Sequence, residues 1–453
     1  MNLLDEVEVY ITYIPDPARR FAERVLGSDV GRRLARGTFW NAASVAVTRA
    51  IMLGALIMVA RILGKQQYGE FGIINSTAGM FMTFAGFGIG MTATKYTAAL
   101  RGTDPDRAGR IIGLSSLFTL GSGAIASTAL FIFAPWVAAH TLAAPHLAPQ
   151  LRIGSLALFS GAVTAAQTGT LTGFEAFRTN AWIAAVGSLA TAIGMVCGAQ
   201  LYGLTGAVWG LVMPSVLMLL LTGVAAHRLA QHHGVLVDYR LCWSERRVLW
   251  DFSLPAFLAG SMVGPVQWAC MAMIAHIPNG YSELGLFSAA NQWYGAIMFI
   301  PGLITGALLP VMSERIAGQN HEQVRKIVKG SMFLIATAVV VPCIVLAFLS
   351  PLVMRLYGKD YAAGSTILVV SVLTAALVAF MAPVGTLISA SGHMWTGFWM
   401  NAGWAAVFLI ATWLLREDGG RGIAFARVGA YGAHALWTFW YIRRILQSDV
   451  EER

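Results

Sequence analysis

One arginine inside an apolar stretch is the first residue of this chain that could do chemistry. Arg49 lies near the middle of the run from Thr38 to Gly64, TFWNAASVAVTRAIMLGALIMVARILG. Such a run can cross a bilayer, which takes about 20 residues. A guanidinium at that depth costs at least ~2.5 kcal/mol to insert, so it faces protein or a water-filled cavity. Arginine binds phosphate groups in a bidentate manner. The position of Arg49 therefore predicts a cavity that binds an anionic substrate. A structural arginine that bonds helix carbonyls is the alternative.

Other polar residues could bind the same substrate. Lys95 ends a second apolar run, where it could receive an anionic group or anchor the helix by snorkelling. Arg178 follows Glu175 in the short turn GFEAFR, so an i,i+3 ion pair competes with substrate contact. Amides in apolar helices could line a binding cavity or hold helices together, since buried amides need partners. They are Asn41, Asn75, Gln167, Asn291 and Gln292.

An acid and several prolines suggest how a transport cycle could be driven. Asp251, in RRVLWDFSLP, could bind a coupling H⁺ or Na⁺, or could stabilise the positive end of a helix. Proline removes a backbone hydrogen bond and bends a helix. Pro255 and Pro265 therefore predict a bending seventh helix, and Pro301 predicts a similar hinge in the eighth.

The remaining candidates have simpler interpretations. His434 is expected to be a hydrogen-bonded packing residue, and Arg427 is expected to snorkel near the outer interface. Glu283 is expected to cap a helix. Four aromatic side chains could stack on sugars or form interface belts. They are Trp250, Trp268, Trp293 and Tyr294.

Composition places the chain in a membrane. Hydrophobic residues make up 57% of the sequence and charged residues 12%, whereas soluble domains carry about 25% charged residues. The net charge of +9 comes from basic residues at helix ends, which set topology and do not indicate nucleic-acid binding. The four cysteines form no CxxC, so neither a disulfide framework nor a metal site is expected. No cleavable signal peptide is recognisable.

Twelve long apolar segments predict an all-α polytopic protein with about twelve transmembrane helices. The expected segments are residues 39–61, 70–95, 111–136, 152–172, 179–200, 204–227, 249–276, 283–312, 328–350, 364–388, 395–415 and 422–442. Lysine and arginine concentrate on the cytoplasmic side if both termini lie in the cytoplasm. The basic residues left on the opposite side are Arg61, Lys65, Arg152, Arg355, Lys359, Arg416, Arg421 and Arg427.

The longest polar connection, RLAQHHGVLVDYRLCWSERR, divides these helices six and six into two lobes. The stretch YGEFGIINSTA (68–78) resembles YSELGLFSAAN (281–291), which predicts parallel repeats with a substrate site between them. The predicted parts are a cytoplasmic tail that includes a possible surface helix (1–37), an N-terminal six-helix lobe (38–228), a cytoplasmic linker (229–247), a C-terminal six-helix lobe (248–444) and a second cytoplasmic tail (445–453).

ARILGKQQYGEFG (60–72) resembles the signature ARxLGxxxYGxF of polysaccharide flippases, the Wzx-like branch of the multidrug/oligosaccharidyl-lipid/polysaccharide exporter superfamily. GFGIGMTATKYTA (86–98), GLFSAANQW (285–293) and LLPVMSER (308–315) are similar to other parts of that family's pattern. The resemblance covers residues 38–444, and the N-terminal tail is longer than the family leads us to expect.

The resemblance implies a fold of two six-helix lobes around a central cavity that opens alternately to each side. It also implies a function and a location. A flippase of this branch moves an undecaprenyl-diphosphate-linked oligosaccharide from the cytoplasmic to the periplasmic leaflet of the bacterial inner membrane by alternating access. Its implied partners are the lipid-linked glycan, membrane lipids, a polysaccharide polymerase and other biosynthesis proteins. Without a nucleotide-binding fold or cofactor, an H⁺ or Na⁺ gradient would drive transport. A cation-coupled small-molecule exporter and a membrane-embedded transferase are the alternatives, and the central arginine and the short outer loops disfavour them.

Overall fold

The computed structural model describes residues 29–317, 321–391 and 394–451. These residues form helices joined by short turns, with no strand in the described ranges. The α-helices are α3 (Asp29–Gly86), α4 (Ile89–Leu100), α5 (Pro105–Trp136), α6 (Ala148–Gly173), α7 (Phe177–His232), α8 (Leu254–Gly260), α9 (Val263–Ala275), α10 (Gly280–Ile297), α11 (Phe299–Ala317), α12 (His321–Phe348), α13 (Ser350–Arg355), α14 (Ser365–Ala390), α15 (Met394–Leu414) and α16 (Gly419–Glu451). Short π or 3₁₀ segments are η1 (Val137–Thr141), η2 (Pro145–Leu147), η3 (Cys242–Glu245), η4 (Leu249–Ser253), η5 (Lys359–Gly364) and η6 (Arg416–Asp418).

The chain is a polytopic all-α membrane protein, as the sequence predicts. Seven helical stretches in the described ranges are long and apolar enough to cross a bilayer. Two of them contain a sharp reversal, at Gly64 in α3 and at Tyr202 and Gly203 in α7. Gly64 (φ 72°) and Gly203 (φ 57°) adopt left-handed backbone conformations that glycine accepts without a Cβ clash. Each of these stretches therefore runs up one side of the bundle and back down. The count of twelve stays a prediction.

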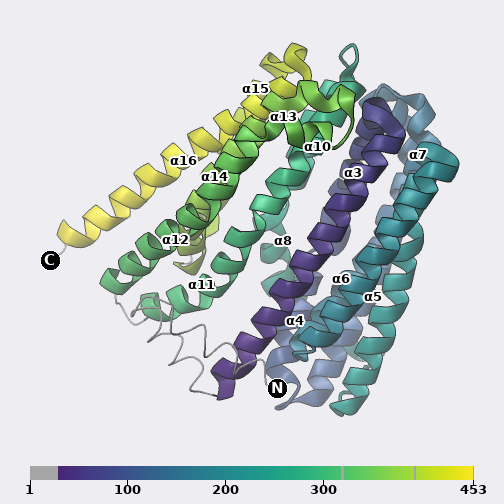
Figure 1. Cartoon of the computed structure of the whole chain (residues 1–453). Coiled ribbons are helices and arrows are strands. Elements are labelled where there is room, and N and C mark those ends of the chain that lie inside the picture. Colours follow the sequence, from purple (N-terminus) through teal and green to yellow (C-terminus); the bar gives the residue numbers. More distant parts are fainter. Residues whose placement is uncertain (1–28, 318–320, 392–393, 452–453) are drawn as a thin grey trace, which may run out of the picture.

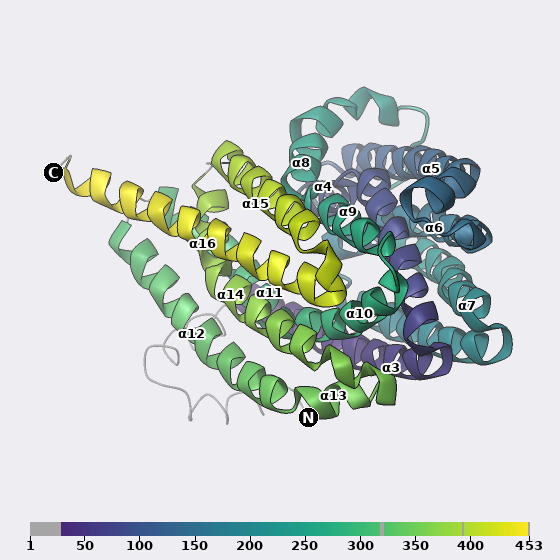
Figure 2. The ribbon, with the colours of Figure 1, turned by 90° about the horizontal axis from the view of Figure 1, so that it is seen from above.

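The helices form two groups that lie side by side (Figures 1 and 2). The first group contains α3 to α7, and the second contains α10 to α16. In Figure 1 the groups meet at the end that carries α13 and the start of α16, and they diverge toward the opposite end. The reversal at Gly64 lies at the end where the groups meet, because its neighbours Ala60 and Lys65 contact Tyr361 and Gly285. We call these two ends the α13 end and the linker end, because residues 233–248 lie at the latter. The division into lobes at residues 229–247 stays a prediction.

The α13 end is held together by the two repeated stretches themselves. A Cβ added to Gly69 would lie 1.8 Å from the carbonyl oxygen of Tyr281, and one added to Gly285 would lie 1.9 Å from that of Lys65. A Cβ on Gly72 would come within 2.4 Å of Ser288 Oγ. Small residues let the backbones of membrane helices approach closely. The starts of the two repeats therefore pack directly against each other.

Two tyrosines add reciprocal hydrogen bonds to this contact. Tyr281 of the second group donates its hydroxyl to the carbonyl oxygen of Leu142 at 2.6 Å. Tyr361, also of the second group, donates to the carbonyl oxygen of Ala60 at 3.3 Å. Tyr68 lies buried beside Tyr357 and Tyr361. The segment after α5 and the segment after α13 are thus each hydrogen-bonded to the opposite group at this end.

Candidate functional site

Arg49 bridges the two groups of helices. Its exposed guanidinium donates from Nη1 to the carbonyl oxygen of Gly295, at 2.9 Å, so a residue of α3 binds the backbone of α10. Roughly 22 Å of helix separate Arg49 from the reversal at Gly64, at 1.5 Å per residue. A neutral carbonyl leaves the positive charge uncompensated. Arg49 is therefore available to an anion between the groups, although it also makes the structural bond given above as the alternative.

The side chain of Arg427 does not lie where the sequence predicted. It is buried, so the prediction that it snorkels near the outer interface was wrong. Its side chain is only 4% exposed, and about 12 Å of helix separate it from the start of α16. Nη1 donates to Asn291 Oδ1 at 2.7 Å, and Cζ lies 3.7 Å from the centre of the Tyr294 ring. Nη2 is buried without a hydrogen-bond partner among the described residues.

One turn of α10 therefore holds both arginines. Asn291 and Gly295 lie four residues apart, on the same face of the helix. Asn291, predicted to contact substrate, accepts the bond from Arg427, whereas Gln292 is next to Tyr68. The side chain of Asn41 lies outside the described residues.

Lys95 contacts the residue that follows Asp251, near the linker end. The Nζ of Lys95 lies 4.1 Å from the centre of the Phe252 ring, one residue after Asp251. Both side chains are exposed. No contact found in the described ranges joins either residue to Arg49. Arg178 is exposed in the first turn of α7, while its predicted neighbour Glu175 pairs with Arg101. The binding and ion-coupling roles of Lys95, Arg178 and Asp251 stay predictions.

The prolines predicted as hinges lie beside breaks in the helices. Pro255 is in α8 and Pro265 is in α9, on either side of the break at residues 261–262. Pro301 is in the first turn of α11, just after the break at Met298 that ends α10. This arrangement fits the predicted bending, which stays a prediction.

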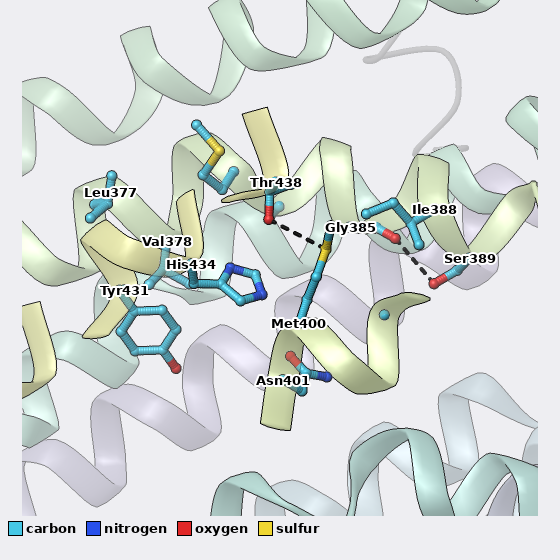
Figure 3. A pocket seen from close by; sticks show the side chains of 13 residues that line it. Leu377, Val378, Gly385, Ile388, Ser389, Met400, Asn401, Tyr431, His434 and Thr438 are labelled. Atoms are coloured by element: carbon cyan, nitrogen blue, oxygen red, sulfur yellow. Dashed lines mark hydrogen bonds between the residues drawn. The ribbon is translucent and has the colours of Figure 1, made fainter. Parts of the chain in front are cut away.

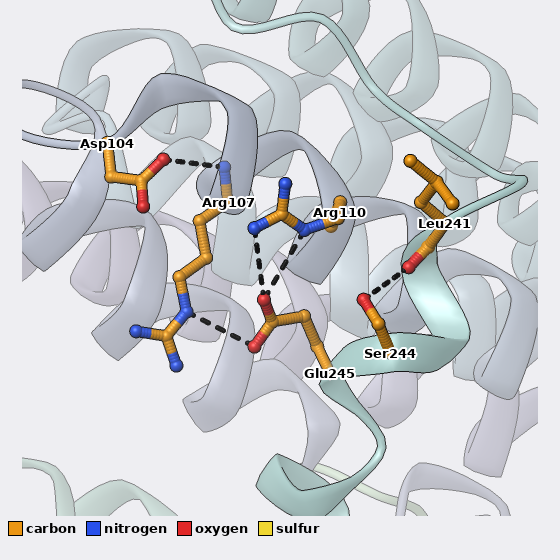
Figure 4. Close-up of polar contacts among 6 residues, drawn as sticks. All are labelled: Asp104, Arg107, Arg110, Leu241, Ser244 and Glu245. Atoms are coloured by element: carbon orange, nitrogen blue, oxygen red, sulfur yellow. Dashed lines mark hydrogen bonds and ion pairs between the residues drawn. The ribbon is translucent and has the colours of Figure 1, made fainter.

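The linker is docked onto the first group of helices, which the sequence did not indicate. Glu245 accepts hydrogen bonds from Arg107 Nε at 3.1 Å and from Arg110 Nη2 at 3.3 Å (Figure 4). Asp238 accepts backbone N–H groups of Arg240 and Leu241, and these bonds, the Leu241 bond most, hold the pKa of its carboxyl below the usual value. Opposite-charge partners across the chain cannot be paired from sequence order alone.

A pocket of about 360 Å³ lies between α14, α15 and α16 (Figure 3). Its walls are mainly apolar, and its polar side chains include Asn401, Tyr431 and His434. His434, expected to be a packing residue, points into this pocket in Figure 3. The sequence could not predict the pocket, because its walls come from three helices far apart along the chain.

Comparison with known proteins places this arrangement in a family. Residues 34–316, more than half of the chain, match the family described as polysaccharide biosynthesis protein. The chain belongs to this family. Over 414 residues it is 26% identical to the EPS I polysaccharide export inner membrane protein EpsE of Ralstonia nicotianae (strain ATCC BAA-1114 / GMI1000), covering 90% of this chain and 92% of EpsE. A Ralstonia solanacearum EpsE is 30% identical over 190 residues, 41% of this chain and 43% of that protein.

Solved structures share the fold of this polysaccharide biosynthesis family member. The lipid II flippase MurJ in an inward closed conformation superposes with a TM-score of 0.67 at 15% identity, covering 89% of this chain and 87% of MurJ. An inward-facing MATE family multidrug transporter of the MOP superfamily superposes with a TM-score of 0.70 at 12% identity, covering 89% and 98%. The predicted superfamily is confirmed, and the relatives are named as exporters and flippases, in agreement with the prediction of a transporter.

Proposed function

We propose that the protein is a flippase that moves an undecaprenyl-diphosphate-linked oligosaccharide from the cytoplasmic to the periplasmic leaflet. The observation that carries this proposal is Arg49, an exposed cation with no acidic partner in the described ranges, bound across the interface between the two groups of helices. A diphosphate must pass its charge through a low-dielectric slab, and a fixed guanidinium lowers that cost. Membership in a polysaccharide biosynthesis family supports the glycan part of the substrate.

In the proposed cycle the two groups of helices rock against each other, so that the contacts at the α13 end form in one state and separate in the other. We place the linker end and both termini in the cytoplasm, as the distribution of basic residues indicates. The tight packing of the repeats at the α13 end then corresponds to a state closed toward the periplasm. An H⁺ or Na⁺ gradient drives the change of state, the lipid tail remains in the bilayer, and the product passes to polymerising enzymes.

The test is leaflet transfer of a lipid-diphosphate oligosaccharide in proteoliposomes. Arg49→Ala should slow transfer about 10- to 100-fold, because a hydrogen bond to a charged group is worth about 1.5–3 kcal/mol. Arg49→Lys should retain part of the activity, since it keeps the charge but loses bidentate geometry.

Arg152→Ala is the matched control, because it removes an exposed arginine at the α13 end, away from Gly295. It should transfer substrate like the parent. Full transfer by Arg49→Ala would make Arg49 structural. Export of soluble cations, with no transfer of any lipid-linked glycan, would favour a small-molecule exporter instead.

A further inference from the structure

The guanidinium of Arg427 is buried without a compensating anion. Its contacts include the neutral amide of Asn291 and the rings of Tyr294 and Phe287, and Nη2 has no partner among the described residues. None of the ion pairs found in these ranges includes Arg427. Ionisable residues inside a membrane protein are costly and generally serve ligand or ion pathways. Holding α16 against α10 needs only a neutral hydrogen bond, so the charge requires another explanation.

Arg427 also shares its support with Arg49. Arg427 binds Asn291, and Arg49 binds Gly295 one turn further along the same face of α10. One arginine comes from α16 and the other from α3. Two cations from opposite groups of helices therefore approach a single turn of α10.

Residues on the same face of α16 as Arg427 line the pocket in Figure 3. Tyr431 follows Arg427 by four residues and His434 by seven, which places all three on one face of α16. Tyr431 interacts electrostatically with Arg427 and also lines the pocket, with His434 and Asn401. A neutral polar surface thus continues from the buried cation into open space within the second group.

We propose that Arg427 is a second anion-binding residue of the transport site and holds one phosphate group of the lipid diphosphate while Arg49 holds the other. This inference rests on the proposed function. A diphosphate esterified at both ends carries one negative charge on each phosphate, which matches two guanidinium groups. In the present conformation Asn291 and Tyr294 cover Arg427. A shift of α10 relative to α16 during the cycle exposes Nη2 to the substrate.

Asn291→Asp is the decisive variant, because it gives Arg427 its own anion without changing side-chain size. A carboxylate 2.7 Å from Nη1 would form a strong charge-assisted bond and neutralise the guanidinium. We expect a folded protein with unchanged or higher thermal stability and transfer reduced about tenfold or more. A purely structural arginine predicts the opposite, that Asn291→Asp is as active as the parent.

A second measurement uses inorganic diphosphate and the purified full chain in detergent. Diphosphate should raise the melting temperature of the parent, because a ligand that binds the folded state stabilises it. The shift should be small in Arg427→Gln and partly restored in Arg427→Lys. Arg421→Gln, which removes an exposed arginine from the same helix, should respond like the parent.

The two measurements separate this inference from the proposed function. If the parent transfers substrate and Asn291→Asp does so equally well, Arg427 is structural and the flippase proposal stands. If the parent transfers no lipid-linked diphosphate, the proposed function fails, and the diphosphate response decides whether Arg427 binds anions. An equal response in parent and Arg427→Gln overturns the inference.

Discussion

At the scale of single residues, the sequence identifies charges in apolar runs but not the direction in which they point. Arg49 was found because it interrupts a long hydrophobic run, and it does lie at the interface between the helix groups. Arg427 was assigned to the outer interface because it lies near the outer end of the twelfth predicted span (422–442), yet it is almost fully buried. Its neighbours Ala424, Ala426 and Ala430 are buried small residues, and they are the signal of close packing that could have corrected the prediction.

Asp251 can be tested at the same scale. If its carboxylate binds the coupling cation, Asp251→Asn should abolish the acceleration of transfer by an imposed H⁺ or Na⁺ gradient. Slow transfer without a gradient should continue, since the binding arginines are intact. The measurement compares transfer rates in proteoliposomes with and without each gradient. Glu417→Gln removes an exposed acid from the α13 end and serves as the control. Gradient-driven acceleration that persists in Asp251→Asn contradicts the coupling role.

At the scale of elements, hydropathy located the helices well, and polarity was a poorer guide to the connections. The helices occupy the expected apolar segments, because burial of backbone groups in lipid demands helix wherever the chain crosses. Three segments predicted as single helices are broken, at residues 87–88, 261–262 and 298. Residues 229–247 were expected to be a cytoplasmic linker, and their polarity did not reveal that they pack on α5. Gly109 and Gly113 make that packing possible, since a Cβ there would lie 1.9 Å from Leu236 O and 2.5 Å from Asp238 O.

Gly113→Ala should displace the linker. Alanine in a helix is intrinsically favoured over glycine by about 0.5–1 kcal/mol, but here the new methyl group collides with the backbone of Asp238. We expect lower thermal stability and faster hydrogen exchange at residues 236–242. Gly121→Ala, in the same helix with open space around the new Cβ, should be neutral or slightly stabilising. Equal exchange in the two variants would show that the linker tolerates the added methyl group.

At the scale of the whole molecule, the internal repeat was the informative feature. The similarity of residues 68–78 and 281–291 predicted two parallel halves, and the structure packs these stretches against each other at the α13 end. Which end is closely packed could not be predicted, because the two states of a transporter share one sequence and differ in free energy by only a few kcal/mol.

Gly69→Ala should shift the protein away from the state seen here. The added methyl group would lie 1.8 Å from the carbonyl oxygen of Tyr281, so the repeats must separate. A cysteine replacing the buried Ser288, in a background without native cysteines, should then react faster with a membrane-impermeant maleimide. Gly79→Ala has open space in the same helix and is the control. Labelling at the same rate in both variants contradicts the gating role of this contact.

The docked linker also bears on how the protein is made. The segment that follows it continues along the first group: Ser253 Oγ lies 2.7 Å from Thr92 Oγ1, and Phe257 stacks on Phe87. The first half of the polypeptide is therefore not fully covered when residue 232 leaves the ribosome. Because domains generally fold from the N-terminus during synthesis, the surface around Thr92 and Phe87 would stay uncovered until residues 253–257 are inserted. An N-terminal fragment that ends at residue 232 would expose this surface to lipid. An N-terminal fragment that extends to residue 260 would keep it covered.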